Sequence, residues 1–136
     1  MLPERLAAAH AEIAAHVDSG AVSRLSTASS IDLACREAGL VIETLPDEME
    51  MKIDVFCILE KFARPQAILA SVTELSVTEI AAMTTRGERC VAMRFDARMR
   101  QMEIVRGKET TAETVGDCRE CGKKLGMEVV VKEGMS

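Results

Sequence analysis

The sequence predicts an α/β fold, a mostly parallel β-sheet with helices on both faces. The prediction rests on residues 38–73, where an unbroken apolar run, a helical stripe and a second apolar run follow one another. The first run, Leu40, Val41 and Ile42, is typical of a parallel strand that is covered on both faces. A strand, a crossover helix and a second strand form a βαβ unit, and such units build parallel sheets.

The helix of this unit is expected over residues 49–62. Its apolar residues recur at helical spacing, from Met49 through Phe56 to Phe62, with charged residues between them. Arg64 and Pro65 end the helix, because the residue before a proline is excluded from the α region. Residues 67–70 then form the second buried strand.

Caps and apolar runs predict the other elements. The spacing Ser76-x-x-Glu79 predicts a helix of two turns, and Thr110-x-x-Glu113 predicts another. Ser30 is a plausible cap for a short helix over residues 31–37. The further expected elements are a first helix at residues 3–18, a short strand at 22–27, strands at 90–95, 102–105 and 127–132, and a helix that carries Val115, Cys118, Cys121 and Leu125 on one face and ends at Gly126.

Composition describes an ordinary globular protein of one domain, residues 1–136. Hydrophobic residues make up 48% and charged residues 29% of the chain. The net charge of -5 gives no electrostatic basis for binding nucleic acid or acidic membranes, and no apolar run is long enough to span a membrane. Five cysteines without a secretory signal favour free thiols in a reducing cytoplasm.

The motif Cys118-x-x-Cys121 is read as two core cysteines. Both lie on the apolar face of the predicted helix, and no second such pair exists to complete a zinc site. His10 and His16 are six residues apart, so they would point to different faces of a helix. We therefore expect no metal site.

Two polar features have alternative interpretations. Arg94, Arg98, Arg100 and Arg106 bracket a turn, where they could bind an anion or form a solvated loop that pairs with Asp96 and Glu103. The loop at residues 46–48 follows a parallel strand, which is where open α/β sheets bind ligands. Its acidic residues could also cap the next helix, and both roles can hold at once.

The residues Gly39-Leu40-Val41-Ile42-Glu43, the turn Leu45-Pro46-Asp47 and Lys52 resemble the NAD-binding domain of the 3-hydroxyacyl-CoA dehydrogenases. The similarity continues through residues 75–81 and 85–89 and ends at 129–132. The resemblance implies a truncated Rossmann-like domain, because the family's glycine-rich first βαβ unit and its helical C-terminal domain have no counterpart here. It also implies NAD as cofactor and places Thr44, Asp47, Lys52 and Thr73 near the cofactor or substrate. Without a glycine-rich loop, NAD binding is expected to be weak or absent.

The same resemblance implies that the catalytic dyad is missing. Arg94 stands where the family has a catalytic His, and Arg106 stands at the position of its Glu. An arginine cannot be deprotonated to take the hydroxyl proton as hydride leaves. We therefore expect no catalytic residue and no turnover by the lone chain.

A missing first strand would leave Leu40–Ile42 as a bare sheet edge that invites pairing with another chain. Either residues 22–27 fold over this edge, or two copies pair through it as a homo-oligomer, which we expect. Three functions remain open: a dehydrogenase-like protein that binds NAD(H), acyl-CoA or another anionic ligand, a non-catalytic oligomerising module, or a fragment without a function of its own.

Overall fold

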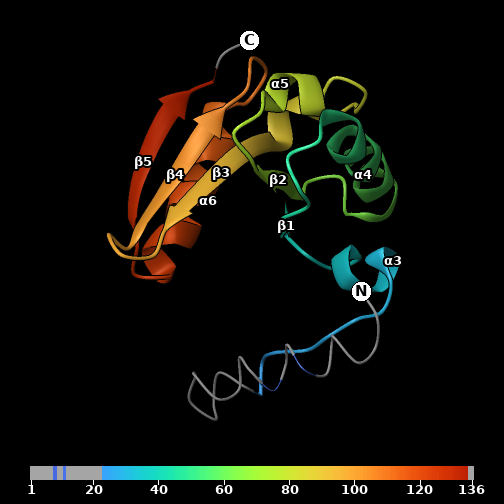
Figure 1. Ribbon diagram of the computed structural model, residues 1–136, viewed down its shortest axis with the longest axis horizontal. Coiled ribbons are helices and arrows are strands. Elements are labelled where there is room, and N and C mark those ends of the chain that lie inside the picture. Colours follow the sequence, from blue (N-terminus) through green and yellow to red (C-terminus); the bar gives the residue numbers. More distant parts are fainter. Residues whose placement is uncertain (1–7, 9–10, 12–22, 135–136) are drawn as a thin grey trace.

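Figure 1 shows the computed structural model, which describes residues 8, 11 and 23–134. Its core is a five-stranded sheet in the order β1-β2-β3-β4-β5. Three strand pairs are parallel, and only β3 and β4 pair antiparallel. The strands are β1 (Leu40–Glu43), β2 (Ile68–Val72), β3 (Cys90–Asp96), β4 (Gln101–Arg106) and β5 (Glu128–Glu133), and the helices are α3 (Ile31–Cys35), α4 (Met49–Phe62), α5 (Val77–Ile80), the 3-10 helix η1 (Gly87–Arg89) and α6 (Ala112–Lys124). The predicted α/β class with a mostly parallel sheet is confirmed.

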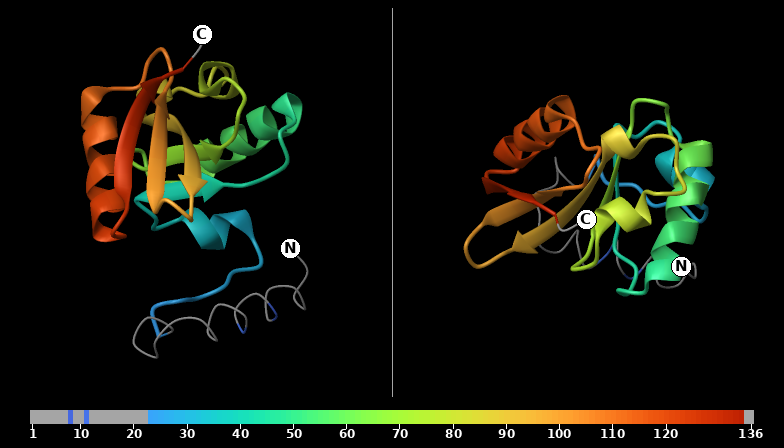
Figure 2. Two further views of the ribbon diagram at one scale, coloured as in Figure 1. Left: turned by 60° about the vertical axis from the view of Figure 1, so that its left-hand side comes forward. Right: turned by 90° about the horizontal axis from the view of Figure 1, so that it is seen from above.

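Helices cover both faces of the sheet, as predicted. The view from above in Figure 2 places α4 and α5 on one side of the sheet and α6 on the other. Phe56 of α4 and Ile80 of α5 belong to one buried cluster, and Cys118 of α6 belongs to a second cluster on the opposite face. Alternating side chains along β2, β3 and β4 supply both clusters.

The central βαβ unit forms at the expected residues, with one correction. Helix α4 spans Met49–Phe62 and buries Phe56 and Leu59, as its stripe predicts. Strand β1, however, is not covered on both faces, because Ile42 keeps 41% of its surface exposed. The reason is its place in the sheet: among the described strands, β1 has β2 as its one neighbour.

Two of the predicted caps are confirmed, but the helix after Ser76 is shorter than expected. The hydroxyls of Ser30 and Ser76 accept hydrogen bonds from the N–H groups of Leu33 and Glu79. Helix α5 makes one turn rather than two. The N–H of Ala82 already bonds three residues back, to the carbonyl of Glu79, so a tight turn replaces the α-helical pattern.

The N-cap of α6 lies one residue later than predicted, at Thr111 rather than Thr110. The Oγ1 of Thr110 accepts from the N–H of Gly107 and donates to the carbonyl of Cys90, so Thr111 caps the helix instead. Gly126 ends the helix as predicted, in the left-handed region at φ 72°. Leu125 does not share the buried face, since it follows the last helical residue and is 58% exposed.

The N-terminal expectations are only partly testable. Residues 23–27 form a turn and irregular chain, so the predicted strand at 22–27 is wrong over the described part of that range. With one leucine in five residues, this stretch has too little apolar surface to bury against a sheet. The predicted helix at 3–18, with His10 and His16, lies outside the described residues except for residues 8 and 11, which are helical.

No helix in the described part of the chain has the length and apolar character needed to cross a membrane. Among the same residues, no group of three or more His, Cys, Asp or Glu side chains could hold a metal ion. The five cysteines are free thiols, and Cys118 is buried while Cys121 is half-buried. Burial raises the pKa of the Cys118 thiol to about 11, which is typical of an unreactive core cysteine.

Candidate functional site at the ends of β1, β2 and β3

The loops that follow β1 and β2 are joined by Asp47 and Thr73. The Oγ1 of Thr73 donates to Oδ1 of Asp47 at 2.5 Å, and the N–H of Glu74 donates to Oδ2 at 3.0 Å. Thr73 Oγ1 also accepts from the N–H of Leu75 at 2.9 Å. Neighbouring parallel strands end at the same edge of a sheet, which is where such folds bind ligands. Two of the residues predicted for the cofactor therefore meet at that edge.

Asp47 is held in its ionised form. The Thr73 hydroxyl, then the Glu74 N–H and then the charge of Lys52 keep the pKa of Asp47 below its ordinary value of 3.8. The side chain of Asp47 bonds to the loop after β2 and also lies 3.7 Å from Lys52 of α4. Glu48 is the N-cap residue of α4, but its side chain makes no hydrogen bond to the helix. The helix-cap interpretation of residues 46–48 is therefore correct in position, since an acidic residue occupies the N-cap, but no side-chain cap bond forms.

Lys52 lies beneath these loops with no exposed surface. Its Nζ donates to both carboxylate oxygens of Glu43, at 2.9 and 3.0 Å, and to the carbonyls of Leu45 at 2.9 Å and Val72 at 3.2 Å. The Ser71 hydroxyl donates to the same carboxylate. One buried ammonium therefore ties the end of β1 to the end of β2 and supports the candidate site from within.

This buried ion pair was not identified from the sequence, although a signal for it exists. Lys52 lies three residues after Met49 and four before Phe56, so it occupies the apolar stripe of α4. A lysine on such a stripe needs a buried partner, and Glu43 ends an apolar strand nearby. Thr44, the fourth residue predicted for the cofactor, is exposed just beyond β1.

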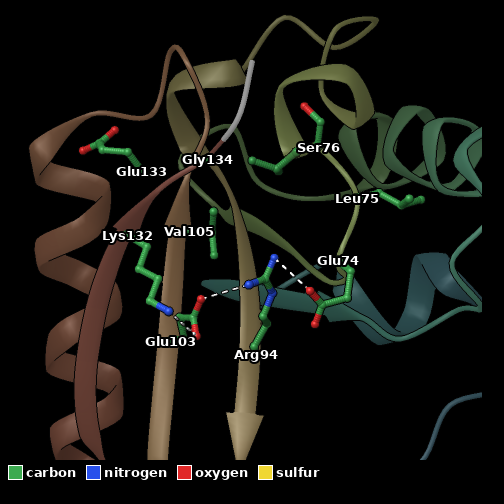
Figure 3. Close-up of a pocket in the computed structure, with 10 residues that line it drawn as sticks. Glu74, Leu75, Ser76, Arg94, Glu103, Val105, Lys132, Glu133 and Gly134 are labelled. Carbon is green, nitrogen blue, oxygen red and sulfur yellow. Dashed lines mark hydrogen bonds and ion pairs between the residues drawn. The ribbon is translucent and has the colours of Figure 1, made fainter.

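Arg94, near the end of β3, lies between carboxylates on two sides (Figure 3). Its Nη1 donates to Oε1 of Glu103 at 3.0 Å, its Nη2 lies 3.2 Å from Oε2 of Glu74, and its Nε donates to the carbonyl of Thr73 at 3.2 Å. Lys132 of β5 lies 3.5 Å from the other oxygen of Glu103. Two cations and two anions thus alternate across β3, β4, β5 and the loop after β2.

The four predicted arginines do not form one site. Arg106 is at the far end of the β3–β4 pair, opposite Val91, where it lies 3.5 Å from the Glu133 carboxylate. Arg98 and Arg100 lie in the exposed turn between the two strands. Only Arg94 therefore stands at the candidate site.

The expected pairing of these arginines with acids is half correct. Glu103 pairs with Arg94, as predicted. Asp96 instead accepts the backbone N–H groups of Arg98 and Met99, both at 3.1 Å, and so stabilises the turn.

Two cavities meet at Arg94 and Glu74. A cavity of about 320 Å³ has Asp47 and Thr73 in its wall, and a second of about 310 Å³ has Val105 in its wall. Arg94 and Glu74 line both, so their ion pair separates the two spaces. Each volume is at the lower end of the roughly 300–1,000 Å³ that small-molecule pockets occupy.

Comparison with known proteins assigns the family. Residues 4–134 match the sequence profile of the family described as 3-hydroxyacyl-CoA dehydrogenase, NAD binding domain. The chain belongs to this family. It is 34% identical over 113 residues to a probable 3-hydroxybutyryl-CoA dehydrogenase of Bacillus subtilis, and 36% identical over 117 residues to a 3-hydroxybutyryl-CoA dehydrogenase of Bradyrhizobium diazoefficiens.

The fold agrees with that of solved members of the 3-hydroxyacyl-CoA dehydrogenase family. A 3-hydroxybutyryl-CoA dehydrogenase from Escherichia coli superposes with a TM-score of 0.84 at 26% identity, over 96% of this chain and 30% of that one. The two curated relatives align with 80% and 83% of this chain. The chain spans only 39% and 40% of their lengths. The comparison therefore supports a Rossmann-like NAD-binding domain.

Proposed function

We propose that this member of the 3-hydroxyacyl-CoA dehydrogenase family binds NAD(H) or acyl-CoA without catalysing hydride transfer. Arg94 carries the proposal, because it stands where the resemblance places the catalytic His. A guanidinium stays protonated at any pH at which the protein folds, so it cannot act as a general base.

A binding role is supported by the loops that Asp47 and Thr73 join. These loops already have fixed positions relative to each other, since two hydrogen bonds to Asp47 and the ammonium of Lys52 join them. A ligand that contacts them would lose less free energy to loop ordering than one that had to organise them. Binding without a glycine-rich loop is expected to be weak.

Titration of the purified chain with NADH, followed by ligand fluorescence, tests binding. The chain contains no Trp and no Tyr, so the protein contributes little emission of its own. Thr73→Val removes the hydroxyl bonded to Asp47 and should weaken NADH binding. Thr85→Val is the matched control, because it removes a hydroxyl that also donates to a carboxylate at 2.5 Å, that of Glu60, away from the site.

Two results would contradict this proposal. Steady oxidation of NADH with acetoacetyl-CoA by the wild-type chain would show that Arg94 does not prevent catalysis. The absence of saturable binding of NADH or acyl-CoA at millimolar concentration would remove the binding function and favour the second candidate.

The second candidate is a non-catalytic module that forms homo-oligomers through β1. Among the described strands, β1 pairs with β2 alone, so its outer N–H and C=O groups can pair with another chain. Ile42 adds an exposed apolar side chain at this edge. Two copies joined edge to edge would extend the sheet across a two-fold axis.

Light scattering at micromolar concentration tests the oligomer. Ile42→Lys should dissociate it, because an edge lysine resists strand pairing. Ile58→Lys is the matched control, since Ile58 on α4 is 41% exposed, as Ile42 is. A wild-type monomer, or equal dissociation by both variants, would refute pairing through β1.

A further inference from the structure

The face of the sheet that carries Arg94 differs from the rest of the core in being charged. Register pairs Ala92 with Val105 and Arg94 with Glu103, so these side chains share one face. Val105 belongs to the apolar cluster on the α4 and α5 side. Beyond it, Arg94 and Glu103 take positions at which a core would carry apolar groups, and they line the cavity of about 310 Å³ seen in Figure 3.

The two carboxylates bound to Arg94 are held very differently. Glu103 is 17% exposed and is shared with Lys132, whereas the side chain of Glu74 is 75% exposed. An ion pair with so exposed a partner contributes little stability. The Glu74 backbone is fixed separately, because its N–H donates to Asp47. The Glu74 carboxylate can therefore leave Arg94 without disturbing the loop.

From this asymmetry we infer that Arg94 is the anchor of a site for a small monocarboxylate, and that Glu74 is a tethered competitor that occupies the anchor when the site is empty. The inference goes beyond the proposed function, because a small monocarboxylate is neither NAD(H) nor an acyl-CoA. A carboxylate of the ligand replaces that of Glu74 on the guanidinium, so one charge-assisted contact is exchanged for another of the same kind.

Charge and shape define the ligand class. Arg94 and Lys132 balance Glu103 and Glu74, and Arg106 balances Glu133, the third carboxylate of the cavity. Removal of the Glu74 carboxylate therefore leaves one positive charge. A single carboxylate restores neutrality, whereas a phosphate dianion leaves an excess negative charge. Val77 and Val105 are buried in the wall of the same cavity and suit a short apolar tail.

Titration calorimetry with hexanoate tests the inference, with hexanamide as its neutral counterpart. Glu74→Gln frees Arg94 and should tighten hexanoate binding by about two- to fivefold, the range that an exposed ion pair represents. Glu133→Gln is the matched control, because Glu133 is a 76% exposed carboxylate of the same cavity that pairs with Arg106 instead. It should leave hexanoate affinity unchanged.

Loss of the anchor gives the complementary test. Arg94→Gln should weaken hexanoate binding about tenfold or more. Arg94→Lys should retain part of the affinity, since it keeps the charge but loses the planar fork. Far-UV circular dichroism of both variants checks that they fold. Hexanamide should bind no better to Glu74→Gln than to the wild type.

Several outcomes would overturn the inference. Failure of hexanoate to bind Glu74→Gln, or an equal rise of hexanoate affinity in Glu74→Gln and Glu133→Gln, would refute it. Unchanged hexanoate affinity of a folded Arg94→Gln, or tighter binding of hexyl phosphate than of hexanoate, would refute it as well.

NADH titration in parallel separates the two proposals. Hexanoate binding without NADH binding would refute the nucleotide function alone, and NADH binding without hexanoate binding would refute the carboxylate site alone.

Discussion

Replacement of Lys52 by Met should destabilise the fold severely. The change keeps the length of the buried stem but removes the ammonium that donates to Glu43 and to the carbonyls of Leu45 and Val72. The Glu43 side chain, 5% exposed, then remains as a buried carboxylate without its counter-ion. Removal of one partner of a buried ion pair typically costs about 3–5 kcal/mol. That is a large share of the roughly 5–15 kcal/mol that stabilises a domain.

Urea unfolding followed by far-UV circular dichroism measures this cost, because the chain has no Trp or Tyr for a fluorescence signal. For a slope near 2 kcal/mol per molar urea, the midpoint should fall by roughly 2 M. Lys61→Met, at an exposed position of the same helix, should change stability by no more than about 0.5 kcal/mol.

A second substitution distinguishes the lost counter-ion from lost packing. Adding Glu43→Gln to Lys52→Met leaves a neutral amide in place of the stranded carboxylate, and an amide costs less free energy to bury. We expect about 1–3 kcal/mol of stability to return. A cost below about 1 kcal/mol for Lys52→Met, or no recovery in the double variant, would refute the interpretation of a buried ion pair that supports the site.

Two further predictions concern Asp47 and the glycines of α6. The hydrogen bonds to Asp47 lower its pKa, so the stability that its carboxylate contributes is present above pH 3.8 and is lost as the pH falls through the lower pKa of the folded state. Urea unfolding over a pH series should show that the difference in stability between wild type and Asp47→Asn shrinks in acid. A difference in stability that grows in acid would contradict this prediction. Gly116→Ala should stabilise the protein by about 0.5–1 kcal/mol, because its Cβ meets open space on a helix. Gly122→Ala should destabilise it by about 1–3 kcal/mol, because its Cβ collides with Val129; equal thermal midpoints for the two variants would show that this packing is looser than described.

The sequence predicts most of the fold because the strands and α4 are fixed by apolar pattern. Helix α4 has a stripe that ends at a proline, and its observed bounds agree with the prediction. The runs at 90–95 and 102–105 become β3 and β4, each extended by a residue or two. Buried apolar area dominates the energy of such elements, so the pattern is sufficient.

The cap of α6 was predicted at the wrong threonine because the hydroxyl of Thr110 has competing hydrogen-bond partners. Thr110 has the spacing of a cap, but its hydroxyl bonds to the backbone of Gly107 and Cys90. Thr111 takes the cap because its own hydroxyl remains available to the N–H of Thr114. Local spacing alone cannot decide between two adjacent threonines, since tertiary contacts determine which hydroxyl is free.

The sequence indicates only part of the candidate site, again because tertiary contacts determine the rest. The resemblance placed Asp47 and Thr73 near a ligand, and they lie in contact. The role of Glu74 was not foreseen, because its pairing with Arg94 depends on two loops and a strand that are distant in sequence. Interactions of this kind follow from strand order and register.

The order of the sheet has a consequence for how this chain acquires its structure. The described strands lie side by side in the order in which they occur in the sequence, so no strand must enter between two that are already paired. Each new strand pairs with the strand before it, so it closes only the single connection between consecutive strands. The entropy cost of loop closure grows only slowly with the length of that connection. The sheet can therefore assemble by stepwise growth along the polypeptide, with β1 and α4 as a folding unit that the later strands extend.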